Sequence, residues 1–94
     1  MNQDYKNEIK EVIKNLVSFR HEIFGLALNL AMKGELEEIN EVFEKNETYE
    51  FSIEHLDKSS DANLQLLVDL IKKIERTAES IANLNRIEIE DYLK

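Results

Sequence analysis

One apolar seam runs through the first third of the chain and constrains its fold more than any other feature. Large apolar residues between positions 5 and 30 are separated by steps of 4, 3, 4, 3, 4, 3 and 4, which is heptad spacing. Residues three and four apart share a helix face, so this spacing predicts one long helix over about residues 4–33. Lys33 and Gly34 are typical of a helix C-terminus. The seam consists of Tyr5, Ile9, Val12, Leu16, Phe19, Ile23, Leu26 and Leu30.

A second apolar line lies beside the seam and makes the apolar stripe wider than a two-stranded coiled coil requires. It consists of Ile13, Val17, Phe24, Ala27 and Ala31. Such a width is typical of a helix that packs against two neighbours in a bundle. We therefore expect the first helix to be part of a bundle.

The rest of the chain also predicts helices, because it contains no proline and the whole sequence has only two glycines. Acidic residues after Gly34 favour a second helix over about residues 35–56. The turn-rich stretch DKSSDAN ends it, and a third helix is expected over about residues 60–92. Near the C-terminus, RIEIEDYLK alternates like a strand, but a lone strand has no partner, so we expect helix there. The predicted fold is all-α: one domain of residues 1–94, an up-down-up antiparallel three-helix bundle.

Composition and charge exclude several classes of function. The chain has no cysteine, so it offers neither a disulfide framework nor a thiolate site. It has no leader-like segment and no apolar run of about 20 residues, so we expect a cytoplasmic protein without membrane insertion. The net charge is −8 and the bases do not cluster along the sequence, so nucleic acid is not an expected partner. Both glycines are isolated, which excludes a glycine-rich phosphate loop.

The two histidines have simple explanations beside more specific ones. His55 opens HLDKSSDANL, which superficially resembles the phospho-accepting motif of histidine phosphotransfer domains. Asp57 replaces an apolar residue of that motif and Ser59 replaces its glycine, so an exposed histidine at a helix C-terminus is the simpler interpretation. His21 is expected to be an ordinary helix histidine. Ser59 and Ser60 are expected to cap a helix rather than to act as nucleophiles.

Acidic side chains remain as candidates for a metal site. Glu75 and Glu79 are four residues apart in KKIERTAESIANL, so both can reach one cation from the same helix face. Their oxygens suit hard metal ions. In a chain this rich in glutamate, the same spacing is also what a solvated helix flank shows by chance. In the second helix, Asn46 occupies a seam position with Glu50 one turn later, and it fits either a register-fixing pair or a ligand role.

Three stretches follow one another along the chain: the long first helix ending at Gly34, GELEEINEVFEKNETYEF, and NLQLLVDLIKKIERTAESIANL. In this order they resemble the PhoU repeat, a three-helix unit, and the likeness covers about residues 8–84. The resemblance implies that Glu75 and Glu79 take the acidic positions of the family's third-helix motif, with Asn46 and Glu50 at those of the second helix. It implies a divalent metal or iron cluster there, although Asn46 replaces an acid that such a cluster would use.

The family likeness gives the first functional hypothesis: a PhoU-like, non-enzymatic regulator or adaptor linked to phosphate or anion transport. Its implied partner is a transporter or regulator protein. Because PhoU proteins carry two repeats and this chain has one, two copies are expected to pair as a homodimer. The alternative is an unrelated acidic three-helix interaction module, of the antitoxin or inhibitor type, that binds a basic protein surface. A histidine phosphotransfer protein is the third hypothesis.

Overall fold

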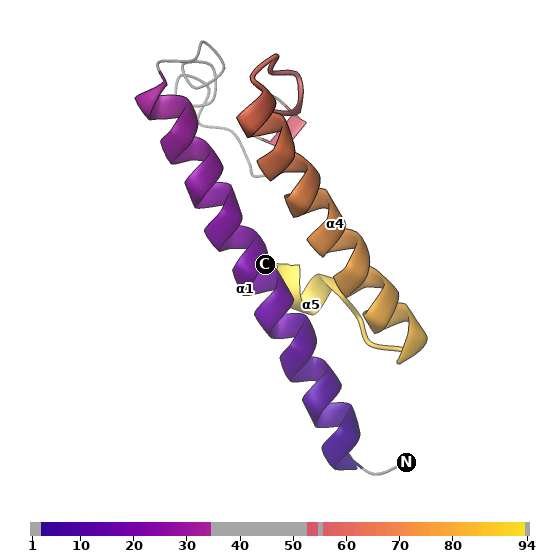
Figure 1. The fold of residues 1–94 in the computed structure, drawn as a ribbon. Helices are drawn as coiled ribbons and strands as arrows, with labels where there is room; N and C mark the ends of the chain where they lie inside the picture. The colour runs from indigo at the N-terminus through magenta and orange to yellow at the C-terminus, as the bar shows by residue number, and fades with distance from the viewer. Residues whose placement is uncertain (1–2, 35–52, 55, 94) are drawn as a thin grey trace. The chain divides into compact units, whose positions relative to one another are not determined.

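The computed structural model describes residues 3–34, 53–54 and 56–93 (Figure 1). Its helices are α1 (Gln3–Lys33), α4 (Ala62–Leu84) and the short α5 (Glu90–Leu93), and these residues form no strand. The all-α prediction is therefore confirmed for them. In this part of the chain no helix combines the length and apolarity needed to cross a bilayer. The chain divides into two compact units, one of residues 1–22 and 72–94 and one of residues 23–71.

The first helix has the predicted bounds, because α1 covers Gln3–Lys33. The backbone N–H of Gly34 donates to the carbonyl of Leu30 at 2.9 Å, which continues the helical pattern by one bond. No glycine among the described residues has a positive φ. Gly34 thus follows the end of α1 without the left-handed conformation that glycine commonly adopts there.

The side of α1 that is buried is the second apolar line rather than the seam. Ile13, Ala27 and Ala31 are completely buried and Val17 is 6% exposed. Five of the eight seam residues are exposed instead, at 37–56%: Tyr5, Val12, Phe19, Leu26 and Leu30. Ile23 of the seam is 6% exposed and Ile9 packs against the buried cluster, so the buried side of α1 combines most of the second apolar line with a minor part of the seam.

Within the first unit, α1 and α4 run antiparallel. Ile13 and Val17 form a buried cluster with Ala82, while further along α1 Arg20 meets Glu75. Rising residue numbers on one helix thus meet falling numbers on the other. The predicted up-down-up order is not confirmed, since it would make the first and third long helices parallel.

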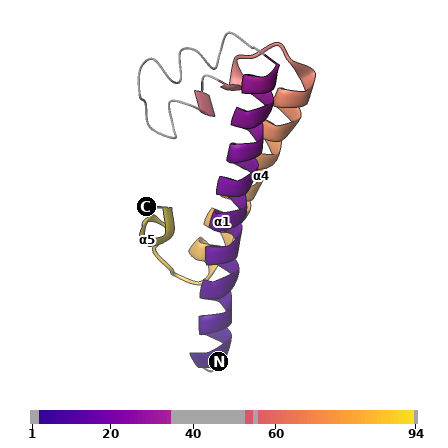
Figure 2. The ribbon, with the colours of Figure 1, turned by 90° about the vertical axis from the view of Figure 1, so that its left-hand side faces the viewer.

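The third helix ends earlier than predicted, at Leu84 rather than near residue 92. Arg86 adopts the left-handed conformation with φ of 58°. The N–H of Ile87 donates to the carbonyl of Ala82 at 2.9 Å and that of Arg86 to Asn83 at 3.3 Å, which is the Schellman pattern. The chain then turns back (Figure 2), and the helix α5 follows. Three side chains of this returning segment pack against the buried cluster: Ile87, Ile89 and Tyr92.

The second unit is described in part, and its buried apolar residues among those described come from three stretches of sequence. They are Ile23, Ala27, Ala31, Ile53, Leu56, Leu64, Val68 and Ile71. Residues 53–54 and 56–57 are helical and Lys58 is in a turn, which agrees with a second helix ending near Leu56. The remainder of that predicted helix, from residue 35 to 52, lies outside the described residues.

The turn that precedes α4 is stabilised by side-chain hydrogen bonds, and it contains no glycine. Asp61 Oδ1 accepts a hydrogen bond from the backbone N–H of Leu64 at 2.8 Å, which makes Asp61 the N-cap. The hydroxyl of the buried Ser59 accepts the N–H of Asp61 at 3.1 Å. Gln65 Nε2 donates to the carbonyl of Ser59 at 2.8 Å, fixing the turn against the helix. The helix starts at Ala62, two residues after its predicted start at Ser60.

The N-cap assignment predicts that Asp61→Ala lowers the free energy of unfolding by about 1 kcal/mol, because the N–H of Leu64 loses its acceptor. Ser60→Ala is the matched control and should change it by less than about 0.5 kcal/mol, since Ser60 is exposed. Urea denaturation followed by circular dichroism measures both variants. Equal losses in the two would contradict Asp61 as the cap.

Candidate functional site

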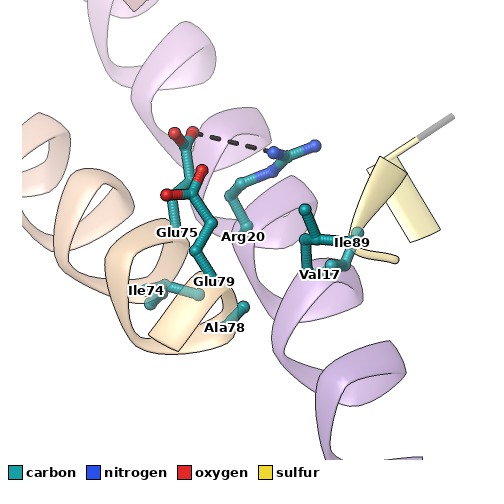
Figure 3. Close-up of a pocket in the computed structure, with 7 residues that line it drawn as sticks. All are labelled: Val17, Arg20, Ile74, Glu75, Ala78, Glu79 and Ile89. Carbon is teal, nitrogen blue, oxygen red and sulfur yellow. Dashed lines mark ion pairs between the residues drawn. The ribbon is translucent and has the colours of Figure 1, made fainter. Parts of the chain in front are cut away.

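The predicted acidic pair lines a small hollow within the first unit (Figure 3). Glu75 and Glu79 project from successive turns of α4, and the small side chain of Ala78 lines the hollow between them. Its volume is about 20 Å³, which is room for one water molecule and far below what a small-molecule ligand needs. The lining residues are Val17, Arg20, Ile74, Glu75, Ala78, Glu79 and Ile89.

Arg20 is the main electrostatic feature of this hollow. Its residue surface is 5% exposed, yet its Nη1 lies only 3.7 Å from Oε1 of Glu75, whose side chain is 31% exposed. Nη2 also lies 3.3 Å from Nε2 of His21, within hydrogen-bond range. Figure 3 shows the guanidinium reaching from α1 toward the carboxylate on α4. The ion pair therefore links the two long helices of the first unit.

Arg20 is a site residue that the sequence interpretation missed, although a signal for it was present. It follows Val17 by three residues and precedes Phe24 by four, so it continues the second apolar line. A charged residue in an apolar line is expected to be paired when that line is buried. Arg20 does not belong to the heptad seam, so the seam pattern gives no indication that Arg20 is buried.

The structure describes two of the four residues that are predicted to bind a metal ion. Glu75 and Glu79 line one hollow, with Glu75 half-buried and Glu79 exposed, whereas Asn46 and Glu50 lie outside the described residues. Among the residues that the structure describes, no group of three acidic or histidine side chains could hold a metal ion. The Arg20 guanidinium already supplies a positive charge at Glu75 and would repel a metal ion bound there. Glu75 and Glu79 alone thus fit an ion pair better than a metal site.

The histidine and serine candidates have different outcomes. His21 is exposed on α1, in agreement with an ordinary helix histidine. His55 lies outside the described residues, so phosphotransfer stays a prediction. Ser59 is 5% exposed and its hydroxyl accepts the backbone N–H of Asp61, so it stabilises the turn before α4, while the helix cap predicted at Ser59 and Ser60 is Asp61 instead.

Folding brings together three bases that are dispersed in the sequence. Lys6 and Lys10 from α1 and Arg86 from the turn after α4 line a hollow of about 220 Å³ in the first unit. Glu88 and Asp91 line the same hollow and offset two of the three charges. The result is a mixed surface, unlike the uniform basic patch of a nucleic-acid binder.

Comparisons of the chain with family models, with curated proteins and with solved structures find no match in any of the three. The resemblance to the PhoU repeat stays a prediction. The described residues define an all-α protein whose predicted acidic pair lies beside a buried arginine.

The ion pair predicts that Glu75→Gln lowers the free energy of unfolding by about 1–2 kcal/mol, because a buried guanidinium loses its opposite charge. Glu79→Gln is the matched control one turn away, and since Glu79 is exposed it should cost less than about 0.5 kcal/mol. Arg20→Met should be close to neutral, because it removes the buried charge and keeps the volume. Chemical denaturation measures all three, and equal effects of the two glutamine substitutions would refute the assigned role of Glu75.

Proposed function

We propose that the protein is a non-enzymatic interaction module that binds another protein through a face of α1. The observation that carries this proposal is a set of large apolar side chains left exposed on that helix. In the first unit Tyr5, Val12 and Phe19 are 52%, 38% and 45% exposed, and they are spaced seven residues apart. Leu16 lies among them and is half-buried. These four residues are called the α1 stripe.

A shallow groove of about 550 Å³ runs along the α1 stripe, which gives a partner a surface of useful size. It is lined by Val12, Asn15, Leu16, Ser18, Phe19 and Glu22. Exposed aromatic and aliphatic side chains in a contiguous row commonly mark protein-binding surfaces. A row at helical spacing suits the mode in which two helix faces pack together.

The two main sequence hypotheses both include contact with a protein through a helix face, and they differ in what surrounds it. A PhoU-like adaptor for phosphate or anion transport adds a metal ion at Glu75, Glu79, Glu50 and Asn46. The Arg20–Glu75 pair does not support that addition. The acidic interaction module needs no metal, so we favour it. Stoichiometric metal in protein purified without chelators, lost in a Glu75→Gln/Glu79→Gln variant, would reverse this preference.

The proposal predicts that a photo-reactive phenylalanine analogue at Phe19 crosslinks to a specific protein in the cells that produce the chain. The same analogue at Lys14 is the matched control, because Lys14 is exposed on the far side of α1. Mass spectrometry identifies the adduct, and the purified partner should then bind at least about tenfold more weakly to a Phe19→Ala variant. The proposal is wrong if the analogue, placed at Phe19 or in a second variant at Val12, gives no adduct beyond that of the Lys14 control.

A further inference from the structure

Acidic and basic side chains of α1 lie at different angular positions relative to the α1 stripe. With about 100° of rotation per residue, Asp4, Glu8, Glu11 and Glu22 all fall within about 100° of Val12 on the same side. All four are exposed and belong to the first unit. Lys6, Lys10 and Lys14 lie more than about 100° from Val12. On its other side, the stripe borders the buried line that packs within the unit. The charged side chains of α1 on the exposed border of the α1 stripe are therefore all acidic.

This acidic border disfavours two occupants from the protein itself. A second copy would bring another acidic border and a net charge of −8 to the same face. Residues 35–50 of the same chain contain seven glutamates and one lysine, so they carry the wrong charge as well. Like charges across an interface oppose binding, which leaves a positively charged partner as the complementary one.

Resting on the proposed function, we infer that the α1 stripe takes a basic amphipathic helix of another protein. Its apolar side chains lie along Val12, Leu16 and Phe19 in the groove. Its lysine or arginine side chains meet the acidic border formed by Asp4, Glu8, Glu11 and Glu22. Phe19 is the anchor, because large aromatic side chains near the centre of a contact carry most of the binding energy. The border charges raise the association rate and make it sensitive to salt.

A pair of synthetic helical peptides tests this inference. Both carry leucines at positions i, i+3, i+4 and i+7; one has lysine and arginine at the flanking positions, and the other has glutamate there. Fluorescence anisotropy with the full chain should show the basic peptide binding at least about tenfold more tightly, and losing affinity as salt rises. Equal binding of the two peptides, or none, overturns the inference.

Variants of the chain locate the bound peptide. Phe19→Ala should weaken binding of the basic peptide about tenfold, and Glu8→Gln/Glu22→Gln should weaken it and reduce its salt dependence. Lys14→Gln is the matched control and should leave binding unchanged. Circular dichroism checks that each variant is folded, which is expected because the four altered side chains are exposed. Binding that is insensitive to Phe19→Ala overturns the assignment of this face.

Two further outcomes would also overturn the inference by naming another occupant. A dimer in light scattering that dissociates in the Phe19→Ala variant would assign the face to a second copy of the chain. Peptide binding that requires deletion of residues 35–50 would assign it to the chain's own segment. A partner crosslinked at Phe19 that binds without a basic helix would keep the proposed function and discard this inference alone.

Discussion

The packing of α1 against α4 in the first unit depends on two alanines, Ala78 and Ala82. These residues are 2% and 0% exposed; Ala82 forms the buried cluster with Ile13 and Val17, and Ala78 lines the small hollow together with Val17. Small residues at a helix contact allow the two backbones to approach closely, since the distance between helix axes follows the side chains at the contact. Ile13 and Val17 of the second apolar line therefore fill this position, while Val12 and Phe19 of the seam lie on the exposed side of α1.

The orientation of α1 about its own axis has two consequences, and both concern function. Arg20, which continues the second line, is buried beside Glu75, so part of the predicted metal site becomes an ion pair. Burying an arginine costs desolvation free energy that an ion pair can offset incompletely, so the pair is better suited to fixing the register of the helices than to stabilising them. Tyr5, Val12 and Phe19 are left on the surface, where they form the proposed binding face.

Several elements could be predicted from local sequence because local interactions decide them. The bounds of α1 follow from uninterrupted helix formers, and the turn before α4 follows from the polar side chains of Ser59 and Asp61. The end of α4 could not be predicted, because arginine rarely adopts the left-handed conformation that Arg86 has. The sequence also could not predict which of the two apolar lines of α1 is buried, because both have helical spacing and only the partner helix distinguishes them. For Glu75 and Glu79, spacing showed a shared face but not the arginine opposite.

The central claim is that Ile13 and Val17 of the second apolar line, and not Val12 and Leu16 of the heptad seam, contact α4 in the first unit. Nuclear Overhauser effects between methyl groups in solution measure this directly. The structure predicts contacts from the methyls of Ile13 and Val17 to those of Ala78 and Ala82, and none from Val12 to α4. Contacts from Val12 and Leu16 to the α4 alanines, with Ile13 and Val17 giving none, would contradict it.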